Sequence, residues 1–151
     1  MSSDDAMNTA HLHLLFNHLP VLGTAFGLGI LGFALWRRSQ EVKQVAFGLL
    51  VVTALLAIPA YLTGEPAESV VKSLPGVSAA VIERHEEAAG VAFASLLALG
   101  VFAFVGILLF RRGRLIPVWF GVVVLVGAMA VSGLMAWTAK LGGEVRHTEI
   151  R

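Results

Sequence analysis

The sequence predicts an all-α integral membrane protein, an antiparallel four-helix bundle with both termini on the outer, periplasmic side. Three observations predict this fold. Of the 151 residues, 57% are hydrophobic and only 14% are charged, and the mean hydropathy is +0.82. The apolar residues form four blocks that contain no Asp, Glu, Lys or Arg, and each has about the 20 residues that a helix needs to cross a bilayer. The basic residues cluster in the two short connections between blocks.

The four blocks are interpreted as transmembrane helices of a single domain that covers residues 1–151. Asp4 and Asp5 precede the first block in place of the basic residues of a signal peptide, so we expect that block to be retained. The predicted spans are residues 13–36, 45–62, 88–110 and 115–138.

The connections predict the orientation in the membrane. The two short ones, residues 37–44 and 111–114, carry six basic residues against one acid, Glu41. By the positive-inside rule this side is cytoplasmic. The long connection, residues 63–87, and both termini then face outward, which in a bacterial inner membrane means the periplasm.

Local signals refine the ends of the helices. In the first block, Asn17 can cap a helix with Pro20 in its first turn, or a helix that starts near Thr9 can be kinked at Pro20, and both readings stay open. Glu65-Pro66 predicts the start of a short helix, and Ser78 predicts the N-cap of a helix that runs directly into the third span.

Composition excludes several functions. Without cysteine, the chain cannot form disulfides, cysteine-ligated metal sites or covalently attached c-type haem, so a metal must be held by nitrogen or oxygen. The formal net charge is only +1 and the basic residues form no long stripe, which argues against a nucleic-acid partner.

All five histidines fall on the predicted outer side. They lie at the starts of the first and third spans and beyond the fourth: His11, His13, His18, His85 and His147. Glu65, Glu86 and Glu144 occupy the same level. Because the helix ends meet in an antiparallel bundle, we expect a shared histidine-based site there.

The spacing of these residues limits how they can be combined. His13 and His18 are five residues apart, which on a regular helix turns them about 140° from each other. If that stretch is helical, they serve different slots; if Asn17 starts the helix, His13 lies on an incoming strand and can fold back. Small residues, Ala25 and Gly29, follow His18 at helical spacing, as would suit the approach of a flat cofactor. Glu144 and His147 have the Glu-x-x-His spacing of carboxylate-bridged metal sites.

These residues also carry a resemblance. His13, His18-Leu19-Pro20, His85 with Gly90, and Gly142-Gly143 with His147 resemble the four-histidine pattern of a group of uncharacterised bacterial four-helix membrane proteins, catalogued as a domain of unknown function. Leu19 stands where that pattern has Phe. The resemblance implies haem or metal binding by four histidines on one membrane face, and some relatives are similar to domains attached to c-type cytochromes.

Three functions stay open from the sequence. The first is a b-type cytochrome-like protein that binds haem b through His18 with His85, and through His13 with His147 as a second pair, with Arg146 on a propionate. It would transfer electrons to or from a quinone or a periplasmic redox partner.

The second function is a non-haem zinc, iron or copper site. Its ligands come from His13, His18, His85, His147, Glu65, Glu86 and Glu144. The third function is a structural subunit without cofactor. In each case the partners include the lipid bilayer, and a homo-oligomer is an open alternative.

Overall fold

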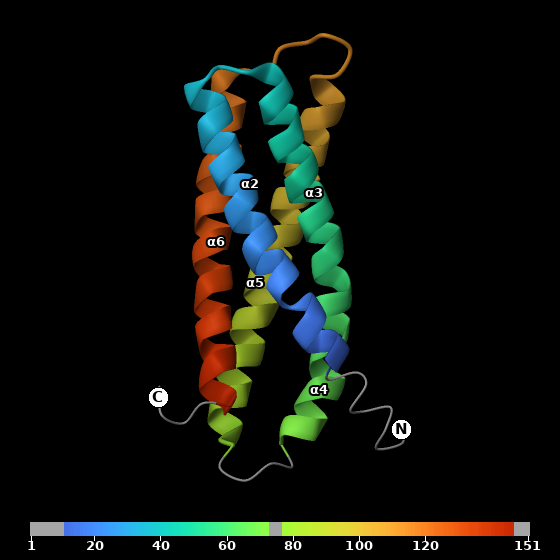
Figure 1. Cartoon of the computed structure of the whole chain (residues 1–151), viewed down its shortest axis with the longest axis vertical. Helices are drawn as coiled ribbons and strands as arrows, with labels where there is room; N and C mark the ends of the chain where they lie inside the picture. Colours follow the sequence, from blue (N-terminus) through green and yellow to red (C-terminus); the bar gives the residue numbers. More distant parts are fainter. Residues whose placement is uncertain (1–10, 73–76, 147–151) are drawn as a thin grey trace.

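The computed structural model describes residues 11–72 and 77–146, without the Arg146 side chain, and it is a bundle of long helices (Figure 1). The described part of the chain contains no β-strand. Four of its helical stretches are long and apolar enough to cross a membrane, so the protein is a multi-pass membrane protein and the predicted all-α four-helix bundle is confirmed. The main helices are α2 (His18–Trp36), α3 (Gln40–Leu62), α5 (Ala79–Leu109) and α6 (Val118–Arg146).

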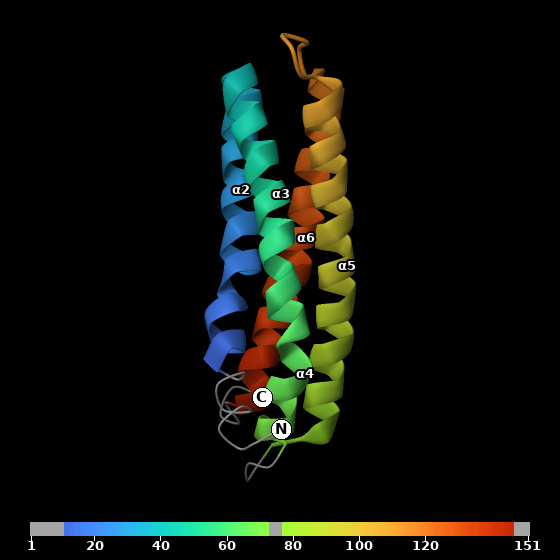
Figure 2. The ribbon, with the colours of Figure 1, turned by 90° about the vertical axis from the view of Figure 1, so that its right-hand side faces the viewer.

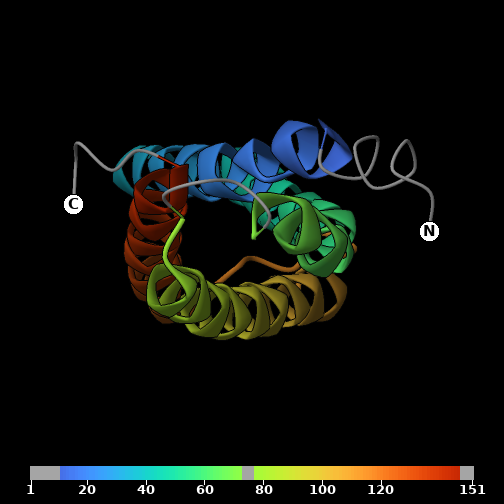
Figure 3. The ribbon, with the colours of Figure 1, turned by 90° about the horizontal axis from the view of Figure 1, so that it is seen from below.

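The helices form a ring in which each packs against two neighbours. The contacting pairs are α2 with α3, α3 with α5, α5 with α6, and α6 with α2. Consecutive helices run in opposite directions, and the view along the bundle shows α2 across from α5 and α3 across from α6 (Figures 2 and 3). Each hairpin, α2–α3 and α5–α6, therefore supplies one helix to each diagonal.

The two ends of the bundle differ in chemistry. We call the end that carries His13, His18 and His85 the histidine end, and the end with the turns 37–39 and 111–114 the arginine end. Both turns contain an arginine with a left-handed backbone, Arg38 at φ 54° and Arg112 at φ 60°. The described chain starts and finishes at the histidine end (Figure 1).

A polar clamp joins the two hairpins at the arginine end. The Gln40 side-chain oxygen accepts a hydrogen bond from the Ile116 backbone N–H at 2.9 Å, and Lys43 Nζ donates to the Ile116 carbonyl at 3.2 Å. Lys43 is only 2% exposed. The sequence predicts Lys43 to be one of the basic residues of a cytoplasmic loop. Instead its side chain is buried, and its hydrogen bond to the Ile116 carbonyl attaches it to the start of the fourth span.

The histidine end shows how the first span begins. Residues 11–16 are helical, Asn17 forms a turn, and α2 starts at His18. Asn17 makes no side-chain cap, and its N–H still bonds the His13 carbonyl at 2.9 Å, so the helix is kinked rather than newly started. The break falls where the ring of Pro20 collides with the carbonyl of the residue four positions earlier. Of the two readings, the kinked helix is the one observed.

The segment between the second and third spans follows its local signals. A short helix, α4 (Gly64–Val71), continues from α3 after a bend at Thr63, and Glu65 lies in its first turn as predicted. Ser78 occupies the N-cap position of α5 with extended backbone, as predicted, but its side chain makes no capping hydrogen bond. The acid in the first turn of α4 favours the start of that helix.

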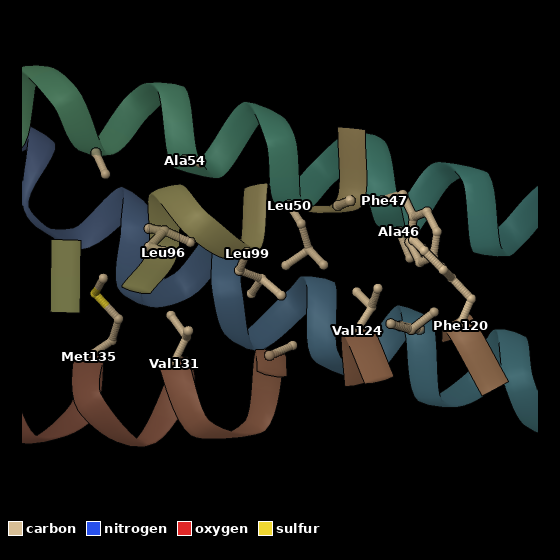
Figure 4. Close-up of a cluster of buried hydrophobic side chains, with 14 of the residues drawn as sticks. Ala46, Phe47, Leu50, Ala54, Leu96, Leu99, Phe120, Val124, Val131 and Met135 are labelled. Carbon is tan, nitrogen blue, oxygen red and sulfur yellow. The ribbon is translucent and has the colours of Figure 1, made fainter. Parts of the chain in front are cut away.

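The core changes in size along the bundle. Towards the arginine end it contains large side chains that interlock across the four helices, among them Phe47, Leu50 and Phe120 (Figure 4). Towards the histidine end the buried residues of α3 and α5 are mainly alanines, Ala57, Ala60 and Ala92. These short side chains leave space beside the backbones of α3 and α5 at this end of the bundle.

Candidate functional site

His13 reaches from the segment before α2 to the end of α3. Its Nδ1 lies 3.0 Å from the Ala60 carbonyl oxygen and 3.3 Å from the Thr63 hydroxyl oxygen. Because a carbonyl can only accept, Nδ1 carries the hydrogen and Nε2 keeps its lone pair. The ring is half-buried. His13 therefore offers Nε2 as a ligand from a fixed position.

His85 is held in the same manner by the other hairpin. It lies on the second turn of α5, half-buried, and its Nδ1 donates to the Thr138 carbonyl of α6 at 3.1 Å. The same reasoning assigns the hydrogen to Nδ1 and leaves the Nε2 lone pair available. A histidine that binds a metal donates its other ring N–H to a carbonyl or carboxylate in just this way, which fixes both tautomer and orientation.

The two anchors are equivalent within the bundle. In each hairpin, a histidine near the start of the first helix bonds a carbonyl near the end of the second helix. A glycine follows four residues after each carbonyl, Gly64 after Ala60 and Gly142 after Thr138. The two bonds lie on different hairpins, which face each other across the ring of helices (Figure 3).

The glycines give the imidazole rings their space. A Cβ at Gly142 would lie 3.0 Å from Cε1 and 3.4 Å from Nδ1 of His85, closer than ordinary contact. A Cβ at Gly64 would lie 3.7 Å from Cε1 of His13, an ordinary contact distance. Gly142 is therefore required by the position of His85, whereas Gly64 is compatible with a small side chain.

Both imidazoles lie at the histidine end of the bundle, and they are held by different hairpins. Each ring donates its Nδ1–H to a carbonyl and keeps its Nε2 lone pair available. The two rings can therefore serve as two nitrogen ligands. Such a pair suits an acceptor placed between them, for example a metal centre with two open positions.

Buried polar atoms nearby lack partners. Asn17 Oδ1 and Thr138 Oγ1 are both shielded from solvent and have no hydrogen-bond partner. Asn17 sits at the kink between His13 and α2, and Thr138 is the residue whose carbonyl holds His85. Unpaired buried polar atoms are rare in proteins and indicate a missing partner. Their presence at this level fits a site that takes a polar ligand.

The other predicted site residues lie apart from this pair. His18 is exposed, and its Nδ1 donates to the Leu14 carbonyl of the preceding turn at 3.0 Å. His13 is thus half-buried and held by the end of α3, whereas His18 is exposed. His147 and the Arg146 side chain lie outside the described residues, so the predicted pair of His13 with His147 and the propionate role of Arg146 stay predictions.

The predicted carboxylate ligands do not join the two histidines. Glu65 and Glu86 are exposed on α4 and α5, and Glu144 lies 3.6 Å from Lys140 in an ion pair on α6. Within the described ranges, no group of three or more histidine, aspartate or glutamate side chains is arranged to hold a metal ion. The described ligand set consists of two imidazoles.

Several residues of this site were missed by sequence reasoning. Ala60 and Thr138 act through backbone carbonyls, which no side-chain motif reveals. Sequence reasoning gave Gly64 no role at the site, although Thr63-Gly64-Glu65 resembles Gly142-Gly143-Glu144 at the end of the other hairpin. Comparing the ends of the two hairpins would have found this similarity.

Comparisons with protein-family models, with curated proteins and with solved structures find no match to this chain. The resemblance to a bacterial membrane family accordingly stays a prediction, and the function must be argued from the site.

Proposed function

We propose that the protein binds one b-type haem between His13 and His85 and serves in electron transfer. The observation that carries this proposal is the matched pair of Nδ1–H···O=C bonds, which leave Nε2 of both rings as donors from different hairpins. Two imidazoles are the axial ligands that a haem iron needs, because the porphyrin supplies the other four nitrogens. The proposed pair differs from the His18–His85 pair that the sequence favoured.

The number of available protein ligands distinguishes a haem site from a site for a bare metal ion. Zinc and non-haem iron take four or more protein or water ligands, and copper(I) prefers sulfur. Two imidazoles alone make a poor site for these ions but a complete axial set for haem. A bare-ion site would need a further donor from outside the described residues, such as His147, and elemental analysis separates the two cases.

Bis-imidazole ligation fits electron transfer better than catalysis at the iron. With both axial positions filled by protein side chains, no position is open to oxygen or another substrate. The residues of this chain would then act by holding the ligands. Ala60 and Thr138 orient the two rings through their carbonyls, and the buried alanines of α3 and α5 exclude water from the space below.

We also propose that the histidine end faces the periplasm of a bacterial inner membrane. The arginine end carries exposed Arg37, Arg38, Arg111, Arg112 and Arg114 in its two turns. An excess of arginine in short loops marks the cytoplasmic side. The haem would then lie near the periplasmic surface, where a soluble or lipid-soluble redox partner can approach it.

The test is an optical spectrum with elemental analysis of the full-length protein, purified in detergent from cells supplied with haem precursor and metals. We expect a Soret band that sharpens on reduction, with about one haem per chain. H13A and H85A should each lose the six-coordinate spectrum, and the matched control H18A should keep it. Bound metal without a Soret band, an apoprotein without either, or equal loss in H18A would refute the proposal.

A further inference from the structure

A groove lies on the outside of the bundle, along the seam between α5 and α6 at the histidine end. Its volume is about 350 Å³. Its lining is mainly apolar and includes one arginine, one glutamate and one tryptophan. The lining residues are Arg84, Glu87, Ala88, Val91, Leu134, Trp137 and Leu141. The proposed function leaves this groove without a role.

Three residues that line the groove are each next in sequence to a residue of the His85 anchor. Arg84 precedes His85 on α5. Trp137 precedes Thr138, whose carbonyl accepts the His85 hydrogen bond. Leu141 precedes Gly142, which lies against the His85 ring. The groove and the anchor of His85 therefore involve neighbouring residues on both α5 and α6.

The shape and polarity of the groove fit a ring with an apolar tail. Trp137 is 52% exposed and presents an aromatic surface, with Lys140 Nζ 5.2 Å from its ring centroid. Val91 and Leu134 continue the apolar lining into the membrane-spanning part of α5 and α6. An amphiphile would lie with its ring beside Trp137 and its tail along the lipid-facing seam.

The charges favour a neutral head group. Arg84 and Glu87, three residues apart on α5, place one cation and one anion in the lining of the groove. The next cation, Lys140, already faces Glu144 at 3.6 Å. A phospholipid phosphate would meet Glu87 as well as Arg84. A quinone or quinol is neutral. The carbonyl oxygen of a quinone can accept from the Arg84 guanidinium, and the hydroxyl group of a quinol can donate to the Glu87 carboxylate.

From these observations we infer that the α5–α6 groove binds the head group of a lipid-soluble quinone or quinol, with Arg84 on a carbonyl oxygen of the quinone, Glu87 on a hydroxyl group of the quinol and Trp137 against the ring. The inference rests on the proposed function for its purpose, because a quinol beside His85 would be the electron donor or acceptor of the haem. The binding itself does not require haem.

The position of the tryptophans allows a direct measurement. Trp36 ends α2 and Trp119 begins α6, so both lie at the arginine end, while Trp137 lies at the histidine end. In the variant W36F/W119F, Trp137 is the sole tryptophan. We would titrate this full-length protein, in detergent, with decylubiquinone and follow the quenching of tryptophan fluorescence, whether or not the preparation contains haem.

We expect saturable quenching of Trp137. In the matched control W36F/W137F, which keeps only Trp119, quenching should rise without saturation as quinone partitions into the detergent. Adding R84Q to the W36F/W119F protein should weaken decylubiquinone binding about tenfold, as expected for loss of one hydrogen bond to a charged group, and E87Q should weaken only the binding of the reduced form, decylubiquinol.

Three results would overturn the inference. These are quenching of Trp137 that does not saturate, a decylubiquinone affinity unchanged by R84Q, and saturable quenching abolished by phosphatidylglycerol, which would identify a phospholipid site. Since fluorescence is read without reference to the Soret band, failure here is distinguishable from absence of haem.

Discussion

Gly142 is the position at which the geometry of the histidine site can be tested with the smallest possible change. In G142A, the added Cβ would lie 3.0 Å from Cε1, 3.4 Å from Nδ1 and 3.6 Å from Nε2 of His85. The ring must then move by a few tenths of an ångström. Its bond to the Thr138 carbonyl is 3.1 Å long, so a movement of this size takes it towards the limit of a useful hydrogen bond.

The expected effect is large on ligand binding and small on folding. Loss of the bond costs about 1 kcal/mol, and the higher helix propensity of alanine returns up to about 1 kcal/mol, so the thermal unfolding temperature should change little. Removing the outer partner of a ligating histidine lowers metal affinity about 10- to 100-fold. We therefore expect G142A to fold normally and to bind haem 10- to 100-fold more weakly, as measured by haem titration of the apoprotein.

Two other glycines provide matched controls. A Cβ at Gly64 would make only ordinary contact with His13, and a Cβ at Gly133 on α6 would meet nothing within 4 Å. G64A and G133A should keep wild-type haem affinity. The reasoning is refuted if G142A binds haem as the wild type does, or if G133A loses as much affinity as G142A.

Three further predictions concern topology and packing. Because the chain has no cysteine, A80C and G113C can each be labelled with a membrane-impermeant maleimide in intact spheroplasts. We expect labelling of A80C alone. Labelling of G113C alone would reverse the proposed orientation. Q40L removes the acceptor of the Ile116 N–H and should destabilise the protein by about 1–3 kcal/mol, as measured by unfolding in detergent. Q44L, at an exposed position, should not destabilise it. Equal effects of the two substitutions would contradict the polar clamp. In G106A the new Cβ would lie 2.5 Å from Phe120 Cε1 and 2.9 Å from Phe47 Cε2, so overpacking should cost about 1–3 kcal/mol, while G48A, with no atom within 4 Å, should unfold at the wild-type temperature or above.

The fold could be predicted because the bilayer restricts the choice so strongly. Backbone polar groups must be paired within each apolar stretch, so four such stretches mean four helices, and short connections mean antiparallel neighbours. Lys43 shows where this reasoning stops. Its position among the loop arginines does not predict its hydrogen bond to the Ile116 carbonyl, which lies 73 residues further along the chain. Contacts between hairpins depend on how the helices pack, and composition does not report this.

The choice between His13 and His18 depended on which face of the first helix points inward. Small residues below His18 seemed to mark the inner face, but Ala25 and Gly29 are exposed, and a Cβ at Gly29 would meet nothing within 4 Å. Small residues occur on lipid-facing surfaces as well as in cores, so this criterion could not decide.

A seven-residue spacing does decide it. In an antiparallel bundle, positions seven apart share one face and line the core. Counting forward from His13 in sevens reaches Pro20, Gly27 and Ala34, all buried, and counting from His85 reaches Ala92, Leu99 and Gly106, also buried. Counting from His18 reaches exposed Ala25 first. The series that follow His13 and His85 are therefore buried and the series that follows His18 is not, and this difference supports the proposed pair of His13 with His85.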